Sequence, residues 1–323
     1  MSEAAAPTVS VVVPTYNRRE RLRTVLAPLL EDDGTLEVVV VVDGSTDGSV
    51  ELLEEISASE PRLRAVVTEN QGLPLARLTG ARAAVGEVVL MLDDDLLPSP
   101  GLATGHARAH QGRDRLVVVG YMPVSTRRRR PREFARELYG REYERAVSGW
   151  EREPGTILTS FWAGNFSLRR VDYVGLADEI AQVVSGYHED LDFGLRCKRA
   201  GLRGEFDRSL LATHLYERDA AGFLRDARSS GANRALLHER HQEDLGPARE
   251  DDAVRDLPRP LHPVVGAGIR LKPAALGLRG AAWLAGTLRL FTLERRLAGL
   301  VWRVEQARAA RAATFERMRE EAG

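Results

Sequence analysis

The first 97 residues alternate apolar runs rich in β-branched residues with segments of helical spacing. The apolar runs cover residues 9–13, 37–42, 63–67 and 87–92. The segments between them, whose apolar side chains recur at the spacing of one helix face, are 17–30, 45–56 and 73–84. No tight hairpin signal joins neighbouring runs. The alternation therefore predicts βαβ units and a parallel sheet flanked by helices.

After residue 97 the pattern is less regular. We expect a strand over 116–121, a charged helix over 131–147 and a short strand over 210–213. Residues 155–168 are compatible with a strand or a loop. From about residue 220 the chain has helical spacing, which predicts a second, helical region.

Net charge and cysteine content exclude several classes of protein. The formal net charge is −1, so the chain as a whole shows no signature of nucleic-acid binding. A single cysteine, Cys197, excludes an internal disulfide framework and a cysteine-based zinc site, which favours a cytoplasmic location. Residues 1–10 lack the basic and apolar regions of a signal peptide. The longest charge-free stretch, 155–168, is too short to span a bilayer.

Two polar clusters follow expected strands. Residues 43–47 (Asp-Gly-Ser-Thr-Asp) end the second strand, and residues 93–95 (Asp-Asp-Asp) end the fourth. Ligands of parallel sheets lie beyond the carboxyl ends of the strands, so we expect the two clusters to lie together. Repulsion among three consecutive carboxylates is relieved by a cation such as Mg²⁺ or Mn²⁺, or by water in a solvated loop. The first cluster, taken alone, favours a plain helix cap.

A third acidic cluster begins the helix expected over residues 189–200. Glu189, Asp190 and Asp192 lie in its first turn, where carboxylates complement the helix dipole. A carboxylate held there stays ionised near pH 7, which suits a general base that deprotonates an attacking hydroxyl. Arg196 is placed to pair with one of these acids or with a phosphate. His214 is either a structural residue or a third ligand of the expected metal.

Six motifs between about residues 8 and 216 resemble, in order and spacing, those of family 2 glycosyltransferases. They are residues 9–18, 43–47, 70–77, 93–95, 163–170 and 189–196. The resemblance implies a GT-A-type, Rossmann-like, mostly parallel sheet flanked by helices, with a C-terminal helical extension. It implies a nucleotide-sugar half over about 1–97, an acceptor half over about 98–220, and an extension over 221–323. Within that extension, residues 246–263 are acidic, contain four prolines and are expected to form a linker.

The resemblance also implies roles for single residues. Asp190 would be the general base, with Glu189 orienting the acceptor. Asp95 would hold the metal that bridges the diphosphate, with Asp93 and His214 as further ligands. The residues implied for nucleotide-sugar binding are Pro14, Thr15, Tyr16, Asn17, Arg18, Asp43, Gly72, Arg77, Asp93 and Asp94. Among them, Thr15 and Asp43 would hold the base and Asp93 the ribose. The residues implied for acceptor binding are Trp162, Gly164 and Asn165.

The implied reaction is a metal-assisted, inverting transfer of a sugar from a nucleoside diphosphate to an acceptor hydroxyl, with Mn²⁺ or Mg²⁺ as cofactor. UDP is the nucleotide that the resemblance favours, and GDP and dTDP are alternatives. The acceptor is a glycan, a lipid carrier, a peptide or a small natural product. The sequence departs from the family pattern at Val42, where an acid is common, and at Leu78, where an asparagine is common.

Two other functions compete with this one. A sugar nucleotidyltransferase would carry a glycine-rich loop after the first strand, but residues 14–18 contain no glycine. A catalytically inactive nucleotide-sugar-binding scaffold would not need Asp43, Asp93, Asp95 and Asp190 together. Both are therefore less favoured than the transferase.

The tail, residues 264–323, carries 11 Lys and Arg residues and 5 Asp and Glu residues. Its segment 276–302 mixes leucine, alanine and aromatic residues with arginines. That pattern predicts either a helix packed within the protein or a homodimer, or an amphipathic helix on anionic lipid. The spacing favours packing. The alternative would place the chain peripherally at the inner face of a membrane, in contact through 264–304.

Overall fold

The computed structural model describes residues 5–124, 133–183, 186–246 and 253–321, which form two compact units. The sheet unit comprises 5–124, 144–183 and 189–216. The helical unit comprises 133–143, 186–188, 217–246 and 253–321. The division after Tyr216 is close to the boundary expected at 220, but the helical unit also takes two earlier segments. The expected linker is described only in part, because 247–252 lie outside the described residues.

The sheet unit is built on one eight-stranded sheet of order β3-β2-β1-β4-β7-β6-β8-β5. Its strands are β1 (Val9–Thr15), β2 (Thr35–Asp43), β3 (Leu63–Thr68), β4 (Val88–Leu92), β5 (Leu96–Pro98), β6 (Leu116–Tyr121), β7 (Asn165–Arg169) and β8 (Arg203–His214). β1 pairs in parallel with β2 and β4, and β2 pairs in parallel with β3. The parallel arrangement predicted for the first four strands is confirmed. β1 and β4 are buried along their whole length, which is why they appear as continuous apolar runs.

The second half of the sheet is mixed rather than parallel. β7 runs antiparallel to both β4 and β6, β5 runs antiparallel to β8, and β6 runs parallel to β8. β8 has 12 residues, whereas we expected a strand only over 210–213. Much of its first half is exposed or half-buried, so no apolar run marks it in the sequence.

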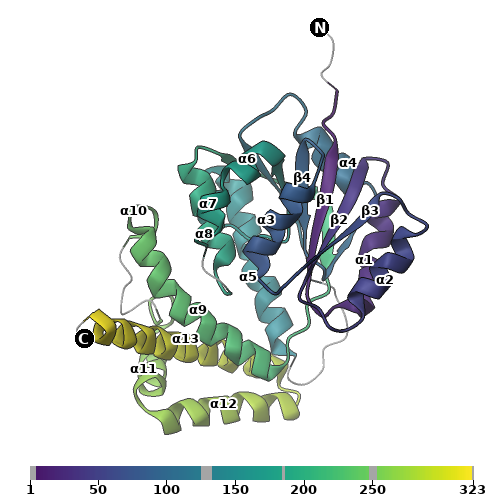
Figure 1. The fold of residues 1–323 in the computed structure, drawn as a ribbon. Helices are drawn as coiled ribbons and strands as arrows, with labels where there is room; N and C mark the ends of the chain where they lie inside the picture. The colour runs from purple at the N-terminus through teal and green to yellow at the C-terminus, as the bar shows by residue number, and fades with distance from the viewer. Residues whose placement is uncertain (1–4, 125–132, 184–185, 247–252, 322–323) are drawn as a thin grey trace. The chain divides into compact units, whose positions relative to one another are not determined.

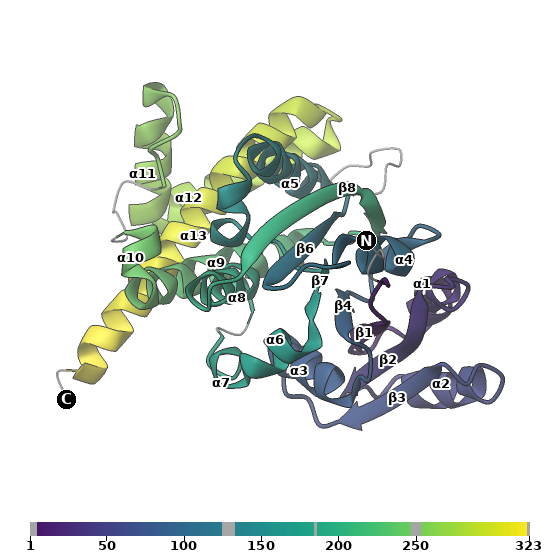
Figure 2. The same ribbon diagram turned by 90° about the horizontal axis from the view of Figure 1, so that it is seen from above.

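Helices cover both faces of the sheet, and Figure 2 shows α1 and α3 on opposite faces. The helices of the sheet unit are α1 (Arg19–Leu30), α2 (Ser49–Ser57), α3 (Leu73–Ala83), α4 (Leu102–Ala109), α6 (Arg170–Gly175), α7 (Ala177–Ile180), α8 (Glu189–Arg199) and the 3-10 helix η1 (Pro154–Thr159). A Cβ on Gly80 would overlap the side chain of Val12. Gly80 therefore allows α3 to pack directly on β1, which holds the start of α3 close to the strand ends.

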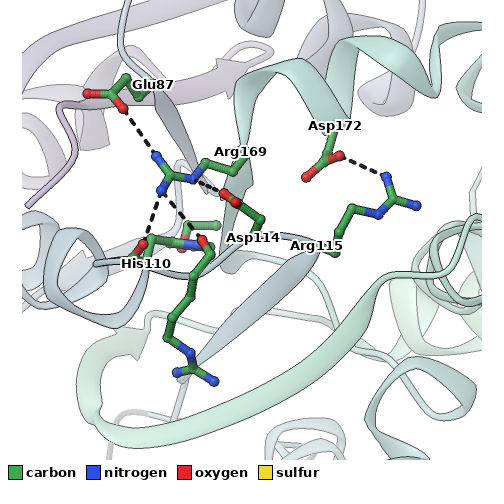
Figure 3. Close-up of polar contacts among 8 residues, drawn as sticks. Glu87, His110, Asp114, Arg115, Arg169 and Asp172 are labelled. Carbon is green, nitrogen blue, oxygen red and sulfur yellow. Dashed lines mark hydrogen bonds and ion pairs between the residues drawn. The ribbon is translucent and has the colours of Figure 1, made fainter. Parts of the chain in front are cut away.

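A charged cluster lies at the amino end of β4, around Arg169 at the end of its antiparallel neighbour β7 (Figure 3). The guanidinium of Arg169, at the end of β7, lies 3.2 Å from carboxylate oxygens of Glu87 and of Asp114. It also donates to the backbone oxygens of His110 and Arg113, at 3.2 Å and 3.4 Å. Both carboxylates are well exposed, so each ion pair contributes roughly 0–1 kcal/mol. We assign this cluster a structural role.

The helical unit is built from packed helices. Its elements are the first ten residues of α5 (Phe134–Arg152), then α9 (Ala220–Arg240), α10 (Gln242–Leu245), η2 (Arg259–Leu261), α11 (His262–Arg270), α12 (Lys272–Thr287) and α13 (Phe291–Glu321) (Figure 1). Val265, Ala275, Leu300 and Val304 form a core between α11, α12 and α13. A Cβ on Gly231 would overlap the backbone of Gln306, so this glycine allows α9 to approach α13 closely. Across the described residues, none of the helices has the length and apolarity needed to cross a membrane.

Candidate active site

The two polar clusters predicted at the strand ends lie at one edge of the sheet. β1, β2 and β4 are parallel neighbours, and they end at Thr15, Asp43 and Leu92. Their carboxyl ends therefore meet, as predicted, although the clusters are fifty residues apart in the chain. The backbone N–H of Asp93 donates to Gly164 O at 2.9 Å, which ties this edge to the start of β7.

The loops that follow β1 and β2 are hydrogen-bonded to each other. The backbone N–H of Asn17 donates to Ser45 Oγ at 2.9 Å, and that of Thr46 donates to Asn17 Oδ1 at 2.8 Å. Asn17 has a φ of 53°, a conformation in which asparagine is enriched. Pro14 is buried, Tyr16 is exposed and Arg18 is half-buried. The Asn17 side chain thus holds the loop that presents Tyr16 and Arg18.

Asp43 fixes the turn before α3. Its Oδ1 accepts hydrogen bonds from Thr68 Oγ1 at 3.1 Å and from the Gln71 N–H at 2.9 Å. Its Oδ2 accepts from the Gly72 N–H at 3.0 Å. Gly72 has a φ of 86°, which favours glycine at this turn. A carboxylate offers about four acceptor positions, and three are occupied here, so one further donor can be accepted.

The triplet Asp93-Asp94-Asp95 places its three carboxylates on three different partners. Asp93 Oδ1 accepts from Arg77 Nη2 at 2.6 Å, and Asp94 Oδ2 accepts from Thr15 Oγ1 at 2.7 Å. Asp95 Oδ1 lies 3.4 Å from His214 Nε2. Burial raises the pKa of Asp94 to about 6, against the opposing effect of the Thr15 hydroxyl. Burial alone would also raise the pKa of Asp95, but His214, together with the charges of Arg18 and Arg21, outweighs burial and holds that pKa below the ordinary value.

Arg77 joins two carboxylates that are far apart in the sequence. Its Nη1 lies 4.0 Å from Asp190 Oδ1, while its Nη2 contacts Asp93. The side chain of Arg77 is only 6% exposed and lies over the ring of Phe166, 5.7 Å from the centroid. Burial alone would lower the pKa of Arg77, but the two carboxylates raise it overall. Arg77 therefore stays charged and holds Asp93 and Asp190 on its two sides.

Asp190 has a raised pKa at the start of α8. It opens α8, as predicted, and accepts a hydrogen bond from the backbone N–H of Ala163. Burial raises the pKa of Asp190 to about 6. The charge of Arg77 lowers this pKa, and the charge of Asp93 raises it. A base with a pKa near 6 is ionised at pH 7 and accepts a proton more readily than an ordinary aspartate. Glu189 lies beside Asp190 in the same turn and is half-buried. Its negative charge helps to raise the pKa of Arg77.

The remaining acid of this helix pairs within the helix. Asp192 is fully buried, and its Oδ1 accepts from Arg196 Nε at 2.8 Å. Of the two partners expected for Arg196, an acid of the same helix is the one observed. This pair holds the first turn of α8, and thereby Asp190, in place.

A metal would fit the pair formed by Asp95 and His214. A carboxylate oxygen and an imidazole nitrogen 3.4 Å apart are donors that Mn²⁺ accepts, and such ions keep further positions for phosphate oxygens and water. Asp93, expected as a further ligand, is turned toward Arg77 instead. Among the residues that the structure describes, no group of three or more acid, histidine or cysteine side chains is arranged to hold a metal ion. The three-ligand set is therefore not formed, and two of its members lie together.

The expected acceptor residues lie where β7 begins. Trp162 is half-buried and Gly164 is buried, with a φ of 129°. A Cβ on Gly164 would lie 3.0 Å from Asp93 Oδ2 and 2.9 Å from Met122 Sδ, so this glycine allows β7 to approach Asp93. Asn165 is fully buried, and its Nδ2 donates to Leu210 O at 2.9 Å. Asn165 thus lies behind the site rather than facing an acceptor.

A buried network behind Asn165 was missed by the sequence analysis. His106 contacts Asn165 Oδ1 through Nε2 at 3.0 Å and Ser167 Oγ through Nδ1 at 2.7 Å. His110 Nε2 contacts the same Ser167 hydroxyl at 2.9 Å. Burial lowers the pKa of His106 to about 3 and that of His110 to about 4, so both are neutral at pH 7. The four-residue spacing of the two histidines on one helix face was the only signal, and their partners are about 60 residues away.

Curated glycosyltransferases match parts of this chain. An uncharacterized glycosyltransferase of Bacillus subtilis, YfnE, is 33% identical over 138 residues, which is 42% of this chain and 32% of that protein. An undecaprenyl-phosphate 4-deoxy-4-formamido-L-arabinose transferase of Pectobacterium carotovorum is 39% identical over 99 residues, covering 28% of this chain and 30% of that protein. The chain thus spans about a third of the length of these relatives.

Solved structures match the fold across more of the chain. The mannosyltransferase PcManGT from Pyrobaculum calidifontis, in complex with GDP-Man and Mn²⁺, has a TM-score of 0.59 at 19% identity and covers 98% of this chain and 90% of its own. GalNAc-T7 with UDP, GalNAc and Mn²⁺ has a TM-score of 0.51 at 14% identity, covering 74% of this chain and 52% of its own. These similarities show a GT-A fold, as predicted. The family model described as "Glycosyl transferase family 2" matches residues 10–171, half of the chain. The chain therefore belongs to glycosyl transferase family 2.

Proposed function

We propose that the chain transfers a sugar from a nucleoside diphosphate sugar to an acceptor hydroxyl, with inversion at the anomeric carbon and with Asp190 as the general base. The observation that carries the proposal is the arrangement of Asp190, Arg77 and Asp93 at the carboxyl edge of the sheet. One arginine lies beside a half-buried carboxylate of raised pKa and beside the acidic triplet. This arrangement puts a proton acceptor next to the residues proposed to hold the donor.

The donor would bind across the strand ends. Thr15 and Asp43 would hold the base, and the fourth acceptor position of Asp43 is available to a base N–H. Asp93 would accept from the ribose, and Arg18 would face the diphosphate. The neighbours PcManGT, with GDP-Man, and GalNAc-T7, with UDP, support a nucleoside diphosphate but not one particular base.

Asp95 and His214 would hold a divalent ion, and their contact at 3.4 Å supports this assignment. When bound, such an ion would stabilise the charge that develops on the leaving diphosphate. Both structural neighbours were solved with Mn²⁺, which favours Mn²⁺ or a similar hard cation here. In this proposal Asp93 binds the ribose only, because it is already engaged with Arg77.

The chemical step is a single displacement. A new bond forms between the acceptor oxygen and the anomeric carbon, while the bond from that carbon to the diphosphate oxygen breaks with its electron pair. Asp190 takes the proton of the acceptor hydroxyl, and the nucleoside diphosphate leaves as an anion. Glu189 would orient the acceptor. Arg77 fixes the carboxylate of Asp190 and limits the repulsion between it and Asp93.

A thermal-shift screen tests the donor site directly. UDP, GDP, dTDP and CDP are each added with and without Mn²⁺, and a ligand that binds only the native state raises the melting temperature. We expect one nucleotide to raise it in a metal-dependent way, and we expect Asp95→Asn to remove the metal dependence. A folded wild-type protein that responds to none of the nucleotides would contradict the proposal and favour an inactive scaffold.

A further inference from the structure

The helical unit carries an apolar face on α12 and on the chain that leads into α13. Its largest members are Leu276, Trp283, Leu284, Leu288, Leu290 and Leu293, which are between 39% and 60% exposed. They are distributed along the chain from α12, through the loop after it, to the first turn of α13. We call these six residues the apolar face. Eight or more exposed apolar side chains between 264 and 293 exceed the isolated exposed leucines of an ordinary surface.

Helix α12 is apolar on both of its sides. Ala275, Ala282 and Ala285 are buried within the helical unit. Leu276 and Leu284, eight residues apart, lie on one exposed stripe of the helix. A helix at the surface of a water-soluble protein normally presents polar residues outward, and one that is apolar all round is normally covered. The pattern indicates that the outer side of α12 meets a second apolar medium.

The exposed charges of the segment that carries the apolar face all have one sign. Residues 263–296 contain six Lys and Arg residues and one acid, Glu294, which is fully buried. Arg279 and Arg295 are engaged inside the helical unit, with Glu305 and with Glu137. The four exposed cations are Arg270, Lys272, Arg289 and Arg296. No carboxylate is exposed in this segment, all of which the structure describes.

A second copy of the chain would fit this surface poorly. A two-fold interface places the same patch on both partners, so it would bring the four cations against four like cations without a compensating carboxylate. Anionic lipid supplies both of the missing parts: headgroups for the cations and hydrocarbon for the leucines. A partly exposed tryptophan, as Trp283 is at 39%, is typical of the boundary between headgroups and acyl chains.

We propose that this apolar and basic surface of the helical unit binds an anionic lipid bilayer, with the apolar face in the acyl boundary and the four cations among the headgroups. The binding is peripheral and reversible. It does not depend on the proposed transfer reaction, and it would hold for an inactive protein as well.

Vesicle flotation of the full chain tests the proposal. The probes are vesicles of phosphatidylcholine alone and vesicles of equal parts phosphatidylcholine and phosphatidylglycerol. We expect the protein to float with the anionic vesicles, to float less with the neutral ones, and to be partly released by high salt, because exposed charges are then screened. A protein that stays in the soluble fraction with both vesicles would overturn the proposal.

Two sets of variants separate the apolar and basic parts. Leu284→Glu with Leu288→Glu is expected to lower the partition constant by at least roughly tenfold, because it puts charge where burial is required. Arg289→Ser and Arg296→Ser are each expected to lower it roughly fivefold on anionic vesicles and little on neutral ones. Phe315→Glu is the matched control, because Phe315 is 63% exposed on α13 but lies outside the face. Circular dichroism verifies that each variant is folded.

Equal flotation of the control and the double glutamate variant would overturn the proposal. So would a sedimentation experiment in which the wild type is a dimer that Leu284→Glu and Leu288→Glu convert to a monomer, while vesicle binding is unchanged. That outcome would assign the surface to a second copy of the chain.

Discussion

Each unit of the protein has a cluster of three charges around one buried central residue, and the two clusters have opposite composition. In the sheet unit, Arg77 lies between the carboxylates of Asp93 and Asp190. In the helical unit, Glu305 lies between Arg228, at 2.9 Å, and Arg279. The first cluster has an excess of negative charge, and the second has an excess of positive charge.

The difference in composition appears in the pKa of one acid of each cluster, Asp190 in the sheet unit and Glu305 in the helical unit. Burial raises the pKa of Asp190 to about 6, and Arg77, which also contacts Asp93, does not offset that effect. The pKa of Glu305 is lowered, because two arginines outweigh the effect of burial. An acid that has two cations for itself is a structural partner, whereas an acid that shares one cation remains able to take a proton. Ion pairs between arginine and carboxylate thus stabilise packing in the helical unit and leave a candidate base in the sheet unit.

Replacing the acid of the sheet-unit cluster should remove activity without removing stability. Asp190→Asn keeps the shape but cannot accept the acceptor proton, so we expect the transfer rate to fall by roughly 10²–10⁴-fold. Nucleotide binding should be unchanged within about twofold, because Asp190 is not proposed to touch the nucleotide. Rates with the responding nucleotide sugar and a calorimetric titration of the nucleotide measure both quantities.

A control separates this effect from general damage. Arg169→Ala removes the structural cluster of Figure 3 at the opposite edge of the sheet and should lower stability more than activity. If Asp190→Asn transfers sugar at the wild-type rate, Asp190 is not the base. The sheet-unit cluster would then have no catalytic role that distinguishes it from the helical-unit cluster.

Replacing Glu305, the acid of the helical-unit cluster, should lower stability without removing activity. Glu305→Ala leaves two arginines without their carboxylate, and we expect a loss of about 3 kcal/mol in the stability of that unit, near the low end for broken buried pairs because Arg228 is half exposed. Hydrogen exchange of α9 and α13 measures the loss within the unit itself. Unchanged exchange in α9 and α13 would mean that the ion pairs of Glu305 do not stabilise the helical unit. A large loss of transfer activity in a still-folded protein would contradict a purely structural role for Glu305.

Exchanging arginine for lysine at matched positions should sharpen the comparison. Arg77 contacts two carboxylates through two nitrogens, and a lysine ammonium cannot reproduce that fork. We expect Arg77→Lys to destabilise the protein by roughly 1–3 kcal/mol, since it leaves one half-buried carboxylate without its partner. Arg279→Lys should have a smaller effect, because Arg228 still neutralises Glu305. Paired melting curves test this order, and equal losses would contradict it.

The pH dependence should differ in sign between the two acids. The raised pKa of Asp190 means that the folded protein binds more protons than the unfolded chain between pH 3.8 and about 6, so this group lowers stability as pH rises through that window. Glu305 has a lowered pKa, so its contribution is present above pH 4.5 and is lost as pH falls below that value. Asp190→Asn should therefore be more stable relative to wild type at pH 7 than at pH 4.

The same titration should appear in the kinetics. Below pH 6 the rate of transfer should fall by about tenfold per pH unit as Asp190 is protonated. Initial rates between pH 5 and 8, with the nucleotide sugar above its KM, measure the profile. A flat profile through pH 6 would contradict the role of Asp190, and an unchanged stability difference between wild type and Asp190→Asn would contradict its raised pKa.

The parallel half of the fold was predictable from sequence, and the mixed half was not. Three of the first four strands, β1, β2 and β4, are buried apolar runs, and helices join the strands, so local pattern and tertiary structure agree there. β7 and β8 pair with partners far away in the chain, and the exposed residues of β8 hide its periodicity. Direction of pairing is a property of the neighbours, which a local pattern does not contain.

The places of the proposed site residues on strands and helices were predictable from the sequence, but their pairing was not. The positions of Asp43, Asp93 and Asp190 at the strand ends and at a helix start follow from the motif spacing. That Arg77 would face both Asp93 and Asp190, or that Asn165 would be bonded to His106 rather than exposed, depends on side chains separated by 16 to 113 residues. Such contacts are set by packing, which has no local signature.

The sequence by itself determined where the carboxylates of this protein lie along the chain, and therefore which edge of the sheet carries them, because strands, helices and their ends are local properties of residue order. Only the tertiary structure decided which charge neutralises which. It turned Asp93 to Arg77, left Asp95 with His214 and gave Glu305 two arginines. The physical reason is that the strength of a charge interaction depends on distance and burial, and both arise only when distant segments pack together.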